Sequence, residues 1–151
     1  MKERYELLLQ QMDALLEGET DTIANLSNVS ALVFHALEHV NWAGFYLHKN
    51  GELILGPFQG KPACMHISLE RGVCGKAARL RETQCIANVH EFEGHIACDG
   101  ASNSEIVVPI IIDGVLFGVL DIDSYEFGNF GEVDVVYLEK LVEGLKAYIV
   151  N

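Results

Sequence analysis

The sequence predicts an α+β fold, in which an antiparallel sheet carries helices on one side. Two observations lead to this fold class. Apolar residues recur at helical spacing near both ends of the chain, in residues 2–17 and 135–149. Between these ends, two pairs of strand-like segments are joined by tight Asn-Gly and Asp-Gly turns, at Asn50 and Asp113. Because such turns connect antiparallel neighbours, we expect hairpins rather than parallel strands.

The chain begins with two predicted helices. The apolar positions of the first are Tyr5, Leu8, Leu9, Met12, Leu15 and Leu16. The segment "GETDT" interrupts this pattern and can cap a second helix through Thr20 or Asp21. The second helix should run to about Glu38, with Ile23, Leu26, Ser30, Val33, Phe34 and Leu37 on one face.

Strand signals dominate the rest of the chain. Strands are predicted at residues 41–48, 52–60, 65–69, 83–88, 105–112 and 115–124, with a short helix at 72–82 and the last helix at 135–149. Residues 88–104 show no periodicity, and a loop of that length inside a compact domain is uncommon and often functional. Since no internal repeat or linker is visible, we expect residues 1–151 to form one domain.

The chain is strongly acidic. Its formal net charge is −12, which should repel nucleic acid and anionic membrane surfaces. It has no run of eighteen apolar residues and no signal peptide at its start, so we expect a cytoplasmic protein that binds neither nucleic acid nor membrane. A domain of 151 residues can bury enough surface to fold without disulfide staples or a structural metal, and the apolar half of the sequence argues against disorder.

Strand alternation brings aromatic and acidic side chains onto a common sheet face. Trp42 and Tyr46 share one face of their strand, and Asp121 and Asp123 point together on the last strand, with Glu105 opening the strand between. Taken singly, the acids could be strand-end residues that face water, and the aromatic pair could belong to the core. Together they suit a small cationic or zwitterionic ligand, held by charge pairing and cation–π contact.

Four cysteines raise the question of redox or metal chemistry: Cys64, Cys74, Cys85 and Cys98. No two of them form a Cys-x-x-Cys pair, so a zinc site that combines Cys64 and Cys98 with His66 and His95 is a weaker interpretation.

The cysteines differ in their surroundings. Cys85 lies in a predicted strand and is expected to be a small core residue. Cys74 opens a predicted helix, where unpaired N–H groups favour a thiolate. Cys98 lies in a polar loop whose acidic residues disfavour a thiolate unless a carboxyl is protonated or His95 is charged. Acidity alone therefore favours Cys74 as the nucleophile.

Several motifs, taken in order, resemble those of a single family. "NWAGFYL", "LGPFQGKPAC", "RGVCG", "HIACDGASNSEIVVPI" and "GVLDIDS" resemble the free methionine-R-sulfoxide reductases, which are built on the GAF fold. The resemblance covers nearly the whole chain. It implies a six-stranded antiparallel sheet with helices on one face and a ligand pocket on the other. It also implies an enzyme that reduces the R epimer of free methionine sulfoxide, and we expect no cofactor and no metal.

The resemblance also implies roles for individual residues. The catalytic cysteine falls on Cys98, whose thiolate would attack the sulfoxide sulfur and become a sulfenic acid. Two other functional cysteines fall on Cys64 and Cys74, and either could form the disulfide that thioredoxin then reduces. The substrate pocket falls on Trp42, Tyr46, Glu105, Asp121 and Asp123.

Crowded carboxyls offer a source for the proton that the sulfoxide oxygen needs, because crowding raises one pKa of the group. We expect Glu105 or Asp123 to supply this proton, Asp121 to bind the substrate ammonium and Trp42 to seat the S-methyl group. For the nucleophile, we follow the resemblance and choose Cys98 over Cys74.

Two other functions compete with this one. A GAF sensory module would bind a cyclic nucleotide or another small ligand without chemistry, but it would not need thiols around its pocket. A zinc-binding structural protein would carry bound metal. The resemblance and the amphipathic N-terminal helix also make a homodimer the expected assembly.

Overall fold

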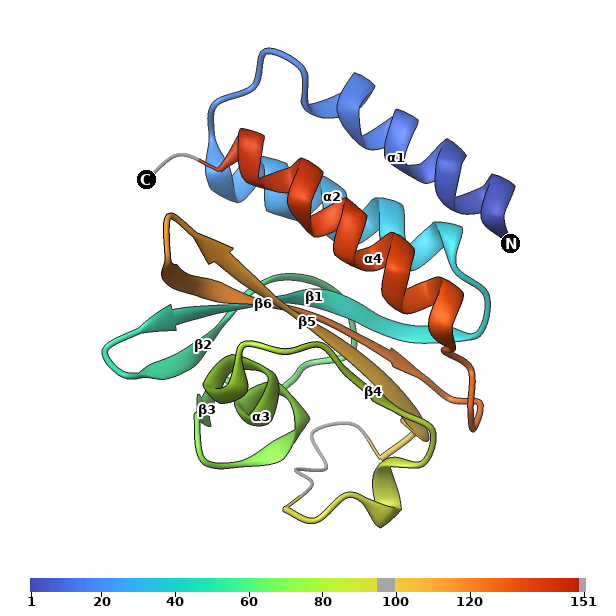
Figure 1. Ribbon diagram of the computed structural model, residues 1–151, viewed down its shortest axis with the longest axis vertical. Helices are drawn as coiled ribbons and strands as arrows, with labels where there is room; N and C mark the ends of the chain where they lie inside the picture. Colours follow the sequence, from blue (N-terminus) through green and yellow to red (C-terminus); the bar gives the residue numbers. More distant parts are fainter. Residues whose placement is uncertain (95–99, 150–151) are drawn as a thin grey trace.

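The computed structural model describes residues 1–94 and 100–149 and has the predicted α+β architecture (Figure 1). Its strands are β1 (Val40–Lys49), β2 (Glu52–Gly60), β3 (His66–Ser68), β4 (Gln84–Ile86), β5 (Ser104–Ile112) and β6 (Val115–Ser124). Its helices are α1 (Lys2–Leu16), α2 (Thr22–Ala36), α3 (Gly72–Leu80) and α4 (Glu132–Leu145), with short 3₁₀ turns η1 (Val89–Glu91) and η2 (Lys146–Tyr148). Each predicted helix and strand has its counterpart.

The strands form one sheet in the order β3-β2-β1-β6-β5-β4, with antiparallel pairing throughout. The two predicted hairpin turns are confirmed. Asn50 and Asp113 each have a φ of 52°, the left-handed conformation that these turns require and that Asn and Asp tolerate. In this strand order, β1 and β6 lie at the centre of the sheet, with two strands on each side.

The two faces of the sheet are covered differently. α1, α2 and α4 lie over one face, as predicted, whereas the short α3 lies on the other face (Figure 1). The apolar layer under the long helices includes Phe45, Ile106, Leu120 and Ile122. The cluster that α3 joins includes Trp42, Tyr46, Val107 and Val119. The alternation predicted along β1 and β6 is therefore confirmed.

A buried polar contact ties α1 to α4. The hydroxyl of Tyr5 donates a 2.5 Å hydrogen bond to Asp134 Oδ1. The other carboxylate oxygen of Asp134 accepts the backbone N–H of Gly131 at 2.8 Å and so caps α4. Burial, reinforced by the hydrogen bond to Asp134, raises the pKa of Tyr5, which keeps its hydroxyl protonated as a donor. The carboxylate of Asp134 thus accepts two donors in the core.

Two glycines allow the central strands to approach their neighbours closely. A Cβ on Gly118 would come within 2.2 Å of the Tyr46 carbonyl oxygen, and one on Gly44 would come within 2.3 Å of Phe58 Cβ. The pairing of β1 with β2 is irregular between Gly44 and Tyr46, which marks a β-bulge. A side chain at either glycine would displace the strands that carry the aromatic residues.

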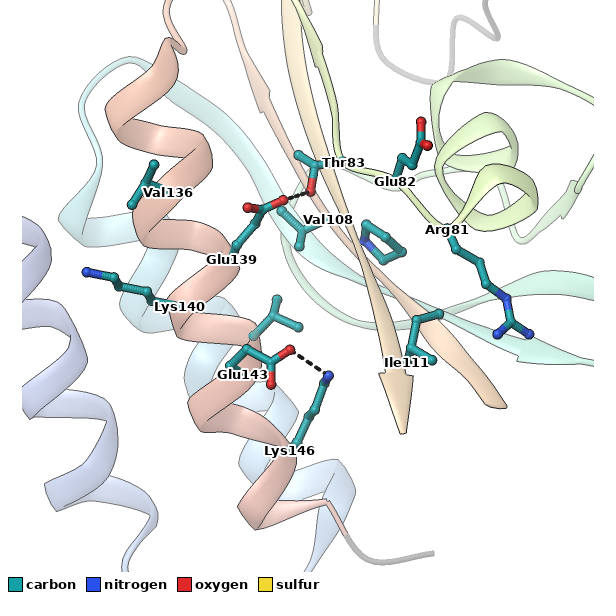
Figure 2. A pocket seen from close by; sticks show the side chains of 12 residues that line it. Arg81, Glu82, Thr83, Val108, Ile111, Val136, Glu139, Lys140, Glu143 and Lys146 are labelled. Atoms are coloured by element: carbon teal, nitrogen blue, oxygen red, sulfur yellow. Dashed lines mark hydrogen bonds and ion pairs between the residues drawn. The ribbon is translucent and has the colours of Figure 1, made fainter. Parts of the chain in front are cut away.

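A surface groove runs between α4 and the part of β5 that β4 does not cover. β4 pairs only with residues 105–107, and beyond them the groove encloses about 720 Å³. Figure 2 shows its lining, with side chains of α4 on one side and those of β5 and of the end of α3 on the other. Pro109 lies in this lining and lacks a backbone N–H, which protects the open strand edge from pairing with another chain.

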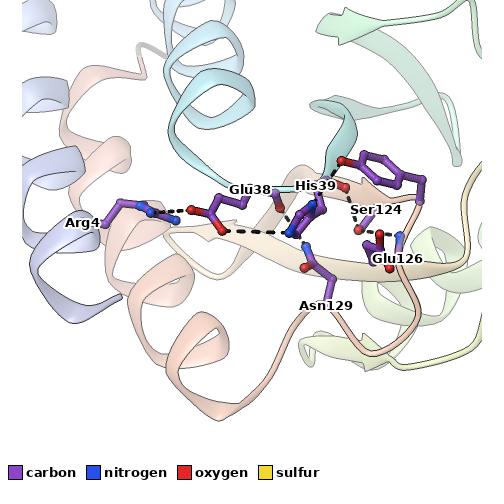
Figure 3. A network of polar contacts seen from close by, with 7 residues as sticks. Arg4, Glu38, His39, Ser124, Glu126 and Asn129 are labelled. Carbon is purple, nitrogen blue, oxygen red and sulfur yellow. Dashed lines mark hydrogen bonds and ion pairs between the residues drawn. The ribbon is translucent and has the colours of Figure 1, made fainter.

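A polar network joins the α2–β1 connection to the turn after β6 (Figure 3). Arg4 forms an ion pair with Glu38 at 2.8 Å, and the imidazole of His39 lies 3.1 Å from the Tyr125 hydroxyl. Ser124 Oγ donates to the His39 carbonyl at 2.7 Å. Because most of these groups are exposed, each pair contributes little stability. Together they locate the start of β1 and the end of β6.

Two predictions about residues 83–104 are wrong. Residues 88–104 are not irregular throughout, because η1 lies within them and Val89 is fully buried. Cys85 is not a core residue: it is exposed on β4, one of the two edge strands of the sheet, and its Sγ contacts the Phe130 carbonyl at 3.4 Å. A separate finding is that none of the helices within residues 1–94 and 100–149 has the length and apolar character needed to span a bilayer.

Candidate active site

Strand register brings three predicted site residues into one row on the face opposite the long helices. Trp42 of β1 lies opposite Asp123 of β6, and Asp123 in turn lies opposite Glu105 of β5. Directly opposed residues have Cβ atoms about 4.5–5.5 Å apart. Asp121 precedes Asp123 by two residues on β6, so both side chains lie on the same face of the sheet. The structure thus gathers the three predicted acids around the end of β6.

α3 adds a thiol to these acids. Cys74 Sγ lies 4.0 Å from Glu105 Oε2, and the ligand atoms of Cys74, Glu105 and Asp121 all lie within 4.8 Å of one another. The exposed fractions of these three residues are 4%, 7% and 5%. The cluster therefore holds a thiol and carboxyls away from water. A divalent cation could bind such donors, but the set differs from the zinc ligands considered from the sequence.

The surroundings of Glu105 alter its protonation. Burial raises the pKa of Glu105 well above its usual range, and the neighbouring carboxyls of Asp121 and Asp123 raise it further by repulsion and hydrogen bonding. An ordinary glutamic acid is ionised at neutral pH. Glu105 keeps its proton to higher pH, because three carboxylates cannot all be charged at close range without cost.

The expectation of an acidic thiol at Cys74 is wrong. Cys74 is the third residue of α3, as the helix-terminus argument requires. Burial nevertheless raises the pKa of its thiol well above the ordinary value, and Asp121, Glu105 and Asp123 add to the effect. A helix terminus contributes only about 0.3–1 kcal/mol to a nearby charge. Desolvation beside three acids outweighs that contribution.

Two aromatic residues border the acids. The rings of Trp42 and Tyr46 stack with centroids 5.8 Å apart, and each is 2% exposed. Trp42 Nε1 donates to the Lys61 carbonyl at 3.1 Å, and the Tyr46 hydroxyl donates to the Cys64 carbonyl at 2.9 Å. Burial, with repulsion from Asp121 next in size, raises the pKa of Tyr46. All five residues predicted to line the substrate pocket therefore lie on one side of the sheet.

Sequence reasoning missed Phe58. Its ring stacks on Trp42, with centroids 5.2 Å apart and planes inclined by 15°. Gly60, nearby on β2, leaves room for the indole, because a Cβ there would come within 2.6 Å of Trp42 Cδ1. The motif "LGPFQG" contains both residues, but only its pairing with β1 shows that they contact Trp42.

The cysteines occupy different states in the structure. Cys64 is disulfide-bonded, whereas Cys74 and Cys85 are free thiols. Cys98, the predicted nucleophile, and His95 lie outside the described residues. His66, part of the alternative zinc set, is exposed and contacts Glu52 at 3.1 Å.

The groove beside α4 is separate from this cluster. Its described lining contains none of the predicted site residues (Figure 2). Two polar pairs lie in its lining: Thr83 with Glu139 of α4 at 2.6 Å, and Lys146 with Glu143 on the α4 side at 2.8 Å (Figure 2). The acids and the aromatic pair thus form the candidate site.

The fold and this site define a class of protein. Residues 24–149 match the model of the GAF domain. A structure titled as a putative GAF sensor protein from Burkholderia vietnamiensis is 50% identical, with a TM-score of 0.95, and the match covers 99% of this chain and 96% of that one.

Reductases are equally similar. Free methionine-R-sulfoxide reductase of Escherichia coli (strain K12) is 51% identical over 144 residues, 95% of this chain and 87% of the relative. A structure of free methionine-R-sulfoxide reductase from Neisseria meningitidis in complex with its substrate is 42% identical, with a TM-score of 0.92, and the match covers 95% of this chain and 87% of that one. The chain therefore belongs to the GAF-domain family and, within it, to the free methionine-R-sulfoxide reductases.

Proposed function

We propose that this protein reduces free L-methionine-R-sulfoxide to methionine by thiol chemistry. The observation that carries the proposal is the buried cluster of Cys74, Glu105 and Asp121 beside the stacked pair of Trp42 and Tyr46. Acids suit the ammonium of a free amino acid, and an aromatic surface suits its S-methyl group. Family membership supplies the reaction type, since relatives that share about half of the sequence are named for it.

In the proposed first step, the Cys98 thiolate attacks the sulfoxide sulfur. The sulfur–oxygen bond of the substrate breaks as the oxygen is transferred to Cys98 and receives a proton. Methionine and a Cys98 sulfenic acid are the products. Two electrons pass from the cysteine sulfur to the substrate sulfur, so no other reductant enters this step.

We assign the proton to Glu105. Its raised pKa supports this choice, because a general acid must still hold its proton near neutral pH. Asp121 is the proposed partner of the substrate ammonium. Asp123, opposite both Glu105 and Trp42, is proposed to bind substrate and to keep Glu105 protonated by its proximity. Trp42 seats the S-methyl group.

The second step forms a disulfide. We propose that Cys64 is the resolving thiol, since it is disulfide-bonded in the structure while Cys74 is free. The raised pKa of Cys74 also argues against it as resolver, because the thiolate is the attacking species. Cys74 retains a proposed role in recycling, by exchange with the disulfide when thioredoxin reduces it.

The proposed assembly is a cytoplasmic homodimer. A groove of about 470 Å³ between α1 and α2 supports it, because its lining includes Leu7 and Leu15, which are 54% and 47% exposed. The groove is also lined by Arg4 and His35 but by no described acid, although the chain as a whole has 22 acidic residues and 10 lysines and arginines. Two such faces can meet without the repulsion that a net charge of −12 otherwise imposes.

One assay tests the function. NADPH oxidation through thioredoxin reductase and thioredoxin is followed with the separated R and S epimers of methionine sulfoxide. We expect turnover of the R epimer only. N-acetylated, amidated methionine sulfoxide lacks the ammonium group that the acidic residues would bind, so it should not be reduced. Equal turnover of that compound would rule out the proposal, and binding without NADPH consumption would favour a sensor.

A further inference from the structure

The connection between β2 and β3 is held by the aromatic pair of the candidate site. Residues 61–65 have no regular secondary structure. Three of their five carbonyls nevertheless have assigned donors: Lys61 accepts from Trp42 Nε1 at 3.1 Å, Cys64 from the Tyr46 hydroxyl at 2.9 Å and Met65 from the Leu55 N–H at 2.9 Å. The position of Cys64 therefore depends on side chains from β1 as well as on its own strand neighbours.

Tyr46 is well suited to hold this connection. Its ring is 2% exposed and stacked on Trp42, so it has little freedom to turn. The direction of its pKa shift, upward, keeps the hydroxyl protonated, and a protonated hydroxyl is the form that donates to a carbonyl. The hydrogen bond is partly buried, so losing it would leave a partly desolvated carbonyl without this donor.

We propose that Tyr46 is a positioning residue for Cys64: its hydroxyl fixes the Cys64 backbone so that the thiol is presented for disulfide formation. This inference rests on the proposed function and adds a step to it. Tyr46 was expected only to line the substrate pocket. Its hydroxyl, however, donates to the backbone of the cysteine that is disulfide-bonded in the structure. One side chain then serves both the substrate and the thiol that acts after it.

The step in question is the attack of Cys64 on the sulfenic acid of Cys98. A sulfur–sulfur bond forms, the sulfur–oxygen bond of the sulfenic acid breaks, and the oxygen leaves as water with the proton from Cys64. No outside reductant takes part. Its rate depends on how often the two sulfurs meet, and misplacing a reacting group by about 1 Å can cost roughly a hundredfold.

The test is Tyr46→Phe, which removes the hydroxyl and keeps the ring. Reduced protein is mixed rapidly with one equivalent of free methionine-R-sulfoxide in the absence of thioredoxin. Released methionine and remaining sulfenic acid are measured over time. Since Tyr46 also borders the substrate, both steps can slow. We expect the ratio of the disulfide rate to the methionine rate to fall by about 10- to 100-fold. An unchanged ratio would overturn the inference.

Tyr5→Phe is the matched control, because it removes another buried tyrosine hydroxyl bond on the far side of the sheet. Its ratio should equal that of the wild type even though its melting temperature falls. If the wild-type protein releases no methionine, the proposed function fails. Disulfide formation in a dithiothreitol redox buffer then tests the positioning alone. Tyr46→Phe should lower the equilibrium constant for the Cys64 disulfide about tenfold relative to Tyr5→Phe, and equal constants would contradict the inference.

Discussion

Buried polar groups have different surroundings on the two faces of the sheet. Under the long helices, the carboxylate of Asp134 accepts the Tyr5 hydroxyl and a backbone N–H. On the other face, Glu105 and Asp121 are buried with a thiol, and burial together with the nearby carboxyls of Asp121 and Asp123 raises the pKa of Glu105. Buried polar groups are usually satisfied, and crowded ones of like charge are typical of functional sites.

A single strand, β6, contributes to both the core and the candidate site. Along β6, Leu120 and Ile122 face the helices, while Asp121 and Asp123 face the site. Adjacent residues therefore have different tasks. Changes on the helix side should reduce the free energy of unfolding, and changes on the site side should reduce activity. Four predictions test this division.

The largest effect is expected from Cys98→Ser. If Cys98 is the nucleophile, this variant should release no methionine even in a single turnover without reductant, because the first bond cannot form. Cys64→Ser should still release up to one equivalent and then accumulate a sulfenic acid. Quantifying methionine per chain, with a sulfenic-acid trap present, distinguishes the two. A full equivalent from Cys98→Ser would move the nucleophile to another thiol.

Glu105→Gln is expected to have the next largest effect on activity. It keeps the size of the side chain and removes its titratable proton, so the rate should fall by roughly 10²–10⁴ if Glu105 is the general acid. Single-turnover release of methionine measures the chemical step directly. Asp123→Asn is the companion variant, and near-normal rates in both would reduce the acids to substrate binding.

Leu120→Ala tests the helix-covered face. Leu120 is fully buried there, so removing its methyl groups should lower the free energy of unfolding by about 2–5 kcal/mol. Activity per folded molecule should change little, since the side chain points away from the site. Urea unfolding and turnover at low temperature give both quantities. A loss of activity as large as that of Glu105→Gln would contradict the division between faces.

The smallest effect concerns pH and stability. Because folding raises the pKa of Glu105 above its ordinary value of 4.5, its contribution to stability is full below that value and is lost as pH rises through the folded pKa. The melting temperature of Glu105→Gln minus that of the wild type should therefore increase from pH 5 to pH 8, by a few degrees at about 2–4 °C per kcal/mol. The corresponding difference for Leu120→Ala should stay constant.

Local sequence patterns predicted most of the helices, strands and turns. The Asn-Gly and Asp-Gly turns and the strict alternation around Trp42 and Asp121 were enough to predict hairpins and faces. Cys85 and Cys74 show where such patterns fail. Cys85 has a strand-like setting, but its exposure depends on β4 being an edge strand of the sheet. The acidity of Cys74 depends first on how deeply α3 buries its thiol and then on which carboxyls lie nearby, and nothing in its neighbouring residues reveals either.

By itself, the sequence determined the elements of this protein and the faces of its two central hairpins. Helical spacing, alternation and turn residues act over a few positions, so they can be read along the chain. The tertiary structure alone decided which residues meet. Glu105 and Cys74 are 31 positions apart, and Tyr46 and Cys64 are 18 apart, yet each pair is in contact. Burial and these contacts produce the pKa shifts and the hydrogen bond to the Cys64 carbonyl, because desolvation, electrostatic forces and hydrogen bonds depend on position in space.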